Sequence, residues 1–216
     1  MRVRKKKNGG VWLEACGELL LPVDKENPAP IALEELFPRA KSYRIEIGCG
    51  KGAFVNALAQ ANPDVGFLAV EKISDVILPA AEKARDGALD NIRFLNCDAA
   101  LLPKLFPEKC FDRIYLNFCD PWPKARHAKR RLTYPATLVA MKTFLADGGK
   151  IEFKTDNGDL FAYSLGSFVE AGYTLDAVTD DLHASEWAAT NIMTEYEKNF
   201  SEKGFPIHRL EAFLEK

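Results

Sequence analysis

The sequence predicts an α/β fold in which a mostly parallel sheet carries helices on both faces. From Tyr43 onward, short apolar segments alternate with segments of helical periodicity, a pattern typical of such sheets. The 216 residues suffice for one domain with a full core, and neither a repeat nor a linker divides them. We therefore expect an N-terminal arm over residues 1–30, partly flexible, and a single domain over residues 31–216.

Seven strands follow from the short apolar segments. The first of them ends at a glycine, and the fifth follows the turn signal Asp147-Gly148-Gly149. Residues 1–30 give no regular pattern because three prolines interrupt them. The expected strands are residues 43–48, 66–70, 92–96, 113–118, 150–154, 173–178 and 208–214.

Four helices are expected between these strands. Small and apolar residues recur at helical spacing from Ala53 to Ala61, and Pro63 ends this first helix. The expected helices are residues 53–61, 76–88, 137–145 and 160–171. Because ligands of such folds bind beyond the carboxyl ends of the strands, we look for functional residues just after each strand.

Composition indicates an ordinary globular protein. Hydrophobic residues make up 47% of the chain and charged residues 28%, and no apolar run is long enough to span a bilayer. The basic N-terminus lacks the apolar region of a signal peptide. Five cysteines without a Cys-x-x-Cys pair argue against a disulfide framework or a zinc site. We expect a cytoplasmic protein that binds neither a metal nor a membrane.

Charge is distributed unevenly along the chain. The net charge is −2, but residues 1–149 carry 23 basic and 18 acidic side chains, a balance of +5, whereas residues 150–216 carry 6 and 13, a balance of −7. The basic clusters are Arg2, Arg4, Lys5, Lys6 and Lys7, and Lys124, Arg126, Lys129, Arg130 and Arg131. This distribution predicts a phosphate-binding face.

A glycine-rich loop, Glu46-Ile-Gly48-Cys-Gly50-Lys-Gly, joins the first strand to the first helix. Glycines let the backbone turn tightly and approach a ligand, and the helix offers free N–H groups. Glu71, at the end of the second strand, can accept hydrogen bonds from ribose hydroxyls. The loop fits S-adenosylmethionine, but it also matches the G-x-G-x-x-A pattern of NAD enzymes. A plain strand-to-helix turn is the third alternative.

Several polar residues at strand ends have two interpretations each. Asp98 follows the third strand and Asp156 the fifth. Either carboxylate can bind a ligand there, and either can cap the following helix. Thr194 and Glu197 likewise fit a capping box. The residues alone leave these alternatives open.

Residues 117–131 place a carboxylate, an aromatic ring and a cationic run side by side. Asp120-Pro-Trp122-Pro follows the fourth strand, and five cations follow within eight residues. The prolines hold the indole at low entropic cost, and a ring held in this way stacks on a purine with about 1–3 kcal/mol. A packed turn around a core tryptophan and a solvated helix face are the alternatives. Beside a carboxylate and a stacking ring, the cations are more typical of a phosphate tract.

Together, these motifs resemble the bacterial tRNA (guanine-N7-)-methyltransferase family over residues 43–207. The matching segments are Glu46-Ile-Gly-x-Gly-Lys-Gly-x-Phe54, Glu71, Asp98, Asp120-Pro-Trp-Pro-Lys124, Arg126-His-x-Lys-Arg-Arg131, Phe153-x-Thr-Asp156, Thr194-Glu-Tyr-Glu-Lys198 and Gly204-Phe-Pro-Ile207. Several motifs in the same order are more specific than any one of them. The resemblance implies a Rossmann-like class I methyltransferase fold, with a seven-stranded, mostly parallel sheet whose last strand is antiparallel.

The resemblance also implies a site and a reaction, the transfer of a methyl group to N7 of guanine at position 46 in the variable loop of tRNA. The implied contacts to S-adenosyl-L-methionine come from Glu46, Gly48, Gly50, Glu71, Asp98 and Asp120, with Asp120 also catalytic. The implied contacts to the guanine nucleotide come from Lys124, Asp156, Thr194, Glu195, Tyr196 and Glu197. The implied contacts to the RNA backbone come from Arg126, Lys129, Arg130 and Arg131. We expect a monomer or a homodimer.

The chemistry of guanine N7 fits these residues. N7 has an in-plane lone pair that is free at neutral pH, so no strong general base is needed. Methyl transfer moves positive charge from the sulfonium to the purine, and carboxylates placed where that charge develops favour it. Asp120, Asp156 and Glu197 are the candidates. A folded tRNA must expose or partly extrude the base.

Two functions of other classes fit parts of the sequence. A nicotinamide oxidoreductase would need an acid–base residue after an early strand, and none of the three histidines, His127, His183 and His208, lies there. A non-catalytic RNA-binding subunit would be favoured by loss of the acidic motif residues, which are all present. We therefore expect an enzyme.

Overall fold

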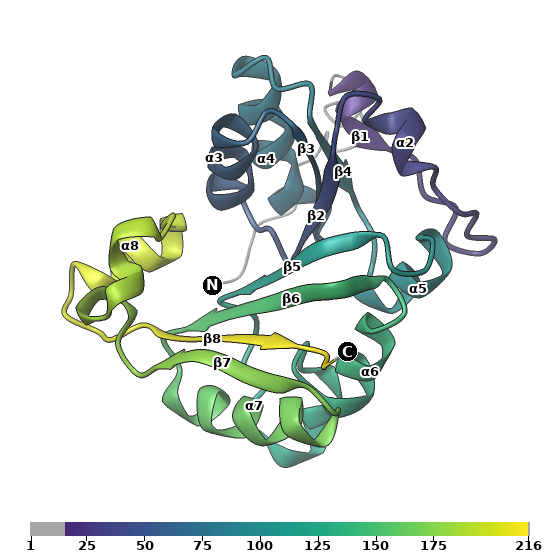
Figure 1. The fold of residues 1–216 in the computed structure, drawn as a ribbon. Helices are drawn as coiled ribbons and strands as arrows, with labels where there is room; N and C mark the ends of the chain where they lie inside the picture. The colour runs from purple at the N-terminus through teal and green to yellow at the C-terminus, as the bar shows by residue number, and fades with distance from the viewer. Residues whose placement is uncertain (1–15, 216) are drawn as a thin grey trace. The chain divides into compact units, whose positions relative to one another are not determined.

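The computed structural model describes residues 16–215 (Figure 1). The N-terminal basic cluster and the start of the expected flexible arm lie outside the described residues. The chain divides into two compact units, one ending at Phe106 and the other beginning at Pro107. The expected single domain over residues 31–216 stays a prediction. Across residues 16–215, no helix combines the length and the apolar character that crossing a membrane requires.

The first unit contains four parallel strands in the order β1-β4-β3-β2. Strands β2 (Ser42–Ile47), β3 (Val65–Val70) and β4 (Ile92–Leu95) confirm the first three expected strands. Strand β1 (Leu20–Leu21), beside β4, was not expected, because two residues form no detectable pattern. All six residues of β3 are buried, as in a strand that is covered on both faces.

Two longer helices pack against these strands (Figure 1). Helix α3 (Ala53–Ala61) has the expected bounds, and α4 (Ser74–Asp86) begins two residues before the expected helix. The short helices of this unit escaped prediction because segments of three or four residues show no helical repeat. They are η1 (Gly17–Leu19), α2 (Leu33–Leu36), η2 (Ala99–Leu101) and α5 (Leu102–Leu105).

The second unit contains four strands in the order β5-β6-β8-β7. Strands β5 (Phe111–Asn117) and β6 (Leu145–Thr155) are parallel. Strand β8 (His208–Phe213) is antiparallel to β6 and to β7 (Thr174–Thr179). Within the two units the pairings are therefore mostly parallel with an antiparallel last strand, as expected.

Strand β6 begins five residues earlier than expected. Leu145 already pairs with Phe111, and a register shift follows before Arg113. The predicted turn at Asp147-Gly148-Gly149 is wrong, because these residues belong to the strand. Gly148 has φ of +76°, so glycine accommodates an irregularity within the strand rather than ending it.

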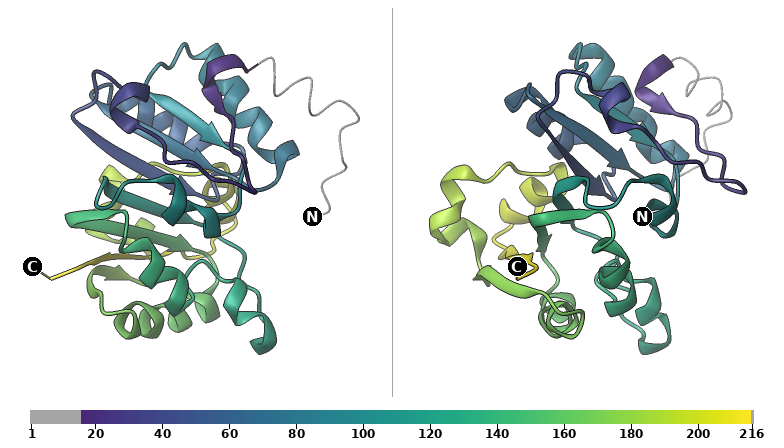
Figure 2. Two further views of the ribbon diagram at one scale, coloured as in Figure 1. Left: turned by 90° about the vertical axis from the view of Figure 1, so that its right-hand side faces the viewer. Right: turned by 45° about the vertical axis from the view of Figure 1, so that its right-hand side comes forward.

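Helices α6 (Pro135–Met141) and α7 (Gly158–Glu170) lie on one face of the second unit's strands (Figures 1 and 2). Phe153 of β6 contacts Phe161 and Phe168 of α7, with ring centroids 6.4 Å apart in each pair. Because side chains alternate along a strand, the neighbouring residues of β6 face the other side. There Glu152 pairs with Arg113 and Arg209.

Three short helices connect β7 to β8. They are η4 (Leu182–Ala184), η5 (Glu186–Thr190) and α8 (Glu195–Ser201). In both figures this yellow-green segment stands beyond the end of β7 and the start of β8. A further short helix, η3 (Ala125–Arg130), follows β5.

Candidate active site

The glycine loop of the first unit leaves open space beside its backbone. Gly50 has φ of +56°, and a Cβ atom there would meet no heavy atom within 4 Å. Gly52 serves packing instead, because a Cβ atom there would lie 2.5 Å from the Cβ of Ala80 in α4. Gly48 continues the strand pairing, since its N–H donates to the carbonyl of Val70 at 2.8 Å. The loop thus combines close helix packing with an accessible turn at Gly50.

Two carboxylates accompany this loop. Glu46, on β2, is 2% exposed. Glu71 follows β3 and accepts hydrogen bonds from the N–H groups of Gly50 at 3.3 Å and Ile73 at 2.9 Å. Burial, followed by the negative charges of Glu46 and Glu71, holds the pKa of the Cys49 thiol well above its usual range. Cys49 therefore stays protonated, first because it is buried and second because of the two carboxylates.

Asp98 caps a helix, as one of its two interpretations predicts. Its side chain caps η2 by accepting from the N–H of Ala100 at 3.0 Å, and it pairs with Lys72 at 3.3 Å. These interactions, the backbone hydrogen bond first, lower the pKa of Asp98 although burial opposes them. The carboxylate is thus ionised at neutral pH, and its side chain remains 57% exposed. The cap therefore leaves room for a ligand contact.

Asp120 lies on an unusual turn of the second unit. The residues on either side of it in the turn, Phe118 and Trp122, have φ of +50° and +41°, a region that bulky side chains rarely adopt. The Trp122 ring is half-buried, so it is not a core tryptophan. It forms a T-shaped pair with His127, with ring centroids 5.8 Å apart, and the Arg130 guanidinium lies 4.9 Å from its centroid.

The cationic tract does not expose all its members equally. Lys124 precedes η3, and Arg126, Lys129 and Arg130 are exposed on this short helix, as the interpretation of a solvated helix face requires. Arg131 is half-buried. Its Nε and Nη2 donate to the carbonyls of Pro121 and Trp122, at 2.9 and 3.0 Å.

Asp156 follows β6 and does not cap α7. The cap is Asn157, whose side chain accepts from the N–H of Leu160 at 2.8 Å. The capping interpretation of Asp156 is therefore wrong. Burial and then the charge of Asp156 raise the pKa of Tyr196, a residue of α8 that is 45% exposed.

Thr194 and Glu197 form the capping box at the start of α8. The Thr194 hydroxyl accepts from the Glu197 N–H at 2.9 Å, and the Glu197 carboxylate accepts from the Thr194 N–H at 3.4 Å. Glu195 and Tyr196, between them, are exposed. The Tyr196 ring stacks on Phe200 at 4.3 Å and lies 5.1 Å from Phe118. The second unit thus brings the turn beside Asp120 into contact with α8.

Sequence reasoning missed the residues that support these positions. Lys154 is 2% exposed, and its ammonium donates to Glu197, to Asn191 and to the carbonyl of Ile192. The available signal was a lysine in an apolar strand immediately before the Thr-Asp motif. Asn191 and His183, which also contact Glu197, left no comparable signal.

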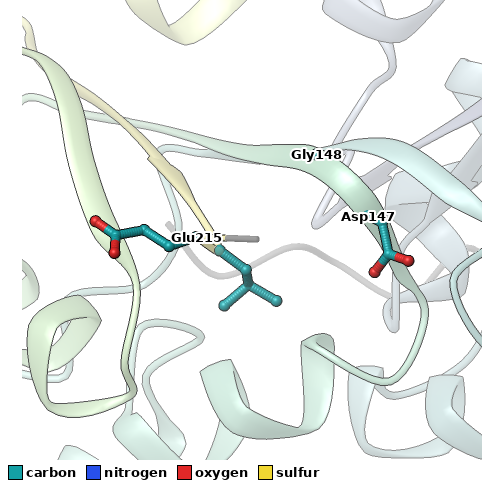
Figure 3. A pocket seen from close by; sticks show the side chains of 4 residues that line it. Asp147, Gly148 and Glu215 are labelled. Carbon is teal, nitrogen blue, oxygen red and sulfur yellow. The ribbon is translucent and has the colours of Figure 1, made fainter.

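A hollow of about 440 Å³ in the second unit lies away from these residues. It is lined by Asp147, Gly148, Leu214 and Glu215 (Figure 3). These residues lie toward the start of β6 and beyond the end of β8, whereas Asp156 and Lys154 lie at the other end of β6. None of the expected site residues lines this hollow.

Comparison with known proteins identifies relatives along the whole chain. The family model Methyltransf_4, described as "Putative methyltransferase", matches residues 40–210. The tRNA (guanine-N(7)-)-methyltransferase of Lachnoclostridium phytofermentans is 50% identical over 182 residues, covering 84% of this chain and 85% of that protein. The protein of the same name from Lactococcus lactis subsp. cremoris is 43% identical, and the match covers 100% of both chains.

Solved structures of methyltransferases share the fold. The 16S rRNA methyltransferase KamB superimposes with a TM-score of 0.65 at 14% identity, covering 90% of this chain and 99% of that chain. An antibiotic-related methyltransferase gives 0.61 at 14% identity, covering 89% and 98%. The Rossmann-like methyltransferase fold is thereby confirmed, and the nicotinamide interpretation of the glycine loop is set aside. The chain belongs to the tRNA (guanine-N(7)-)-methyltransferase family.

Proposed function

We propose that this protein transfers a methyl group from S-adenosyl-L-methionine to N7 of guanine, at position 46 in the variable loop of tRNA. One observation carries the proposal: the chain matches a relative of that name over its full length at 43% identity. The geometry of the second unit supports it, because a carboxylate on a constrained turn and exposed cations lie on one continuous segment, from Asp120 to Arg130.

We assign the methyl donor to the carboxylates and glycines that follow the strands. The residues are Glu46, Gly48, Gly50, Glu71, Asp98 and Asp120. S-adenosylmethionine carries ribose hydroxyls, an adenine amino group and a sulfonium cation, all of which suit anionic acceptors. The open space beside Gly50 and the ionised Asp98 fit such a ligand. When bound, this donor supplies an electrophilic methyl group.

Asp120 is proposed as the catalytic carboxylate. The guanine N7 lone pair forms the new bond to the methyl carbon while the bond from carbon to sulfur breaks. Positive charge consequently appears on the purine, and a fixed carboxylate stabilises it without taking a proton. The constrained turn around Asp120 favours this role, because a carboxylate held in place needs little reorganisation during the reaction.

We assign the guanine nucleotide to Lys124, Asp156 and the start of α8. The N1–H and amino donors of guanine suit carboxylate acceptors, and Asp156 and the exposed Glu195 carry carboxylates. The exposed ring of Tyr196 suits stacking on the base. Thr194 and Glu197 hold the first turn of α8 through the capping box. We therefore propose that these two residues shape the subsite for the guanine nucleotide. Arg126, Lys129 and Arg130 suit the RNA backbone.

The test is methylation of unmodified tRNA with a labelled methyl donor, followed by mapping of the modified nucleotide. The proposal expects label at N7 of the variable-loop guanine. An Asp120→Asn variant, which keeps the shape and removes the charge, provides the matched control and is expected to lose the label. Label on another nucleotide, or transfer that is unaffected in Asp120→Asn, would overturn the assignment.

A further inference from the structure

The turn that carries Asp120 contains few of the groups that normally hold a turn together. Pro121 and Pro123 lack backbone N–H donors, so neither residue can donate a hydrogen bond. Phe118 and Trp122 both have positive φ, a conformation that persists only where the surroundings enforce it. Hydrogen bonds from other residues to the carbonyl groups of the turn are therefore important for holding its conformation.

Arg131 binds two of these carbonyls. Its Nε donates to Pro121 at 2.9 Å and its Nη2 to Trp122 at 3.0 Å, so one planar guanidinium spans both residues that follow Asp120. The Cζ atom of the guanidinium lies over the Tyr163 ring of α7, 4.1 Å from its centroid. The guanidinium is thus held both by two hydrogen bonds and by a contact with an aromatic ring.

The neighbouring cations differ in this respect. Arg126 and Lys129 are exposed, and so is Arg130, whose guanidinium lies over the Trp122 ring. These side chains are accessible to a polyanion. Arg131 is half-buried, and two of its donor nitrogens are already engaged with the protein.

We propose that Arg131 is a positioning residue for the Asp120 carboxylate rather than a contact to the RNA backbone, an inference that rests on the proposed function for its effect on turnover. Its guanidinium holds the carbonyls of Pro121 and Trp122 and thereby stabilises the positive φ of Trp122. Lysine cannot replace it, because a single ammonium does not span two carbonyls and also cover the Tyr163 ring as the guanidinium does.

The test compares Arg131→Lys, which keeps the charge, with Arg126→Ala as the loss of an exposed cation on the same segment. For Arg131→Lys we expect kcat to fall roughly 10- to 100-fold, as for a misplaced catalytic group. The affinity for tRNA and its salt dependence should stay close to those of the wild type. For Arg126→Ala we expect a higher KM for tRNA, with a salt slope shallower by about one.

Hydrogen exchange provides a readout that does not depend on activity. Exchange in the peptide covering residues 117–124 should accelerate in Arg131→Lys and stay unchanged in Arg126→Ala, with thermal unfolding midpoints measured for both. Unchanged exchange together with wild-type kcat in Arg131→Lys would overturn the positioning role, as would an Arg131→Ala variant whose only defect is a shallower salt slope. Faster exchange in Arg131→Lys, combined with a wild-type protein that does not methylate tRNA, would refute the proposed function and leave the role of Arg131 in the turn intact.

Discussion

The ammonium of Lys154 lies 2.9 Å from the carboxylate of Glu197, and both side chains are almost completely buried. Lys154 comes from β6 and Glu197 from the first turn of α8, so this pair fixes α8 to the strand that leads to Asp156. Asn191 and His183 also contact the Glu197 carboxylate, the histidine at 3.3 Å. The position of Tyr196 therefore depends on a carboxylate that is itself shielded from solvent.

Glu197→Ala is predicted to destabilise the protein by about 3–5 kcal/mol, because it leaves the buried Lys154 without its counter-charge. The measurement is the free energy of unfolding in urea. Glu202→Ala removes an exposed carboxylate just after the same helix and should stay within about 0.5 kcal/mol of the wild type. Equal effects of the two substitutions would contradict the role of the pair.

Asp120→Ala is predicted to abolish methyl transfer without loss of the fold. Asp120 is exposed, so removal of its carboxylate leaves no buried partner uncompensated. Single-turnover rates and the urea unfolding midpoint are the measurements. Near-wild-type turnover would show that Asp120 has no catalytic role.

Replacement of Arg126, Lys129 and Arg130 together by alanine is predicted to weaken tRNA binding and to flatten its salt dependence. Each cation that neutralises a phosphate contributes about 0.7 to 0.9 to the slope of log K against log salt, so the slope should fall by roughly two to three. Filter binding over a range of salt concentrations measures it. An unchanged slope would show that the tract does not contact phosphates.

Glu211 is predicted to make stability depend on pH in the acid range. Burial favours its neutral form, but Lys150, Arg209 and Arg113 outweigh burial and lower the pKa of Glu211 below its usual value of 4.5. A lowered pKa adds stability above the pKa of the unfolded chain, and this stability is lost as the pH falls through the folded value.

The comparison for this prediction is Glu211→Gln in urea unfolding at several pH values. The wild type should be more stable than the variant at neutral pH, and the difference should narrow below about pH 4.5 as the carboxyl protonates. A difference that stays constant down to about pH 3 would show that Glu211 contributes through packing alone.

Calorimetry is predicted to show binding of S-adenosylmethionine and no binding of NAD. Glu71→Ala should weaken the binding of S-adenosylmethionine. Glu71 accepts a hydrogen bond from the N–H of Gly50 in the glycine loop, and it also offers the ligand an anionic acceptor. Glu35→Ala, in α2 of the same unit, is the control. Tight binding of NAD would restore the nicotinamide interpretation.

The sequence predicted most strands of the two units because they are short apolar segments, as in β3, where every residue is buried. It failed where structure is short or depends on tertiary contacts. Gly148 belongs to a strand rather than a turn, because β5 pairs with the preceding segment. A strand that continues through glycine leaves no separate periodic signal.

The roles of the candidate site residues were harder to predict. Capping motifs identified the contacts of Asp98 and of Thr194 with Glu197 correctly, because capping depends on neighbours in sequence. The buried partner of Glu197 is 43 positions away in the chain, and its identity follows only from the pairing of β6 with the later segment. Arg131 shows the same limit, since a run of cations does not reveal which member folds back on its own turn.

The most direct measurement of the central claim compares two tRNA substrates that differ in one atom of the target base. One carries guanine at position 46 and the other carries 7-deazaguanine, in which carbon replaces N7. With a labelled methyl donor, we predict one methyl group per molecule on the first tRNA and none on the second. Equal labelling of both tRNAs, or labelling of neither, would contradict methyl transfer to guanine N7.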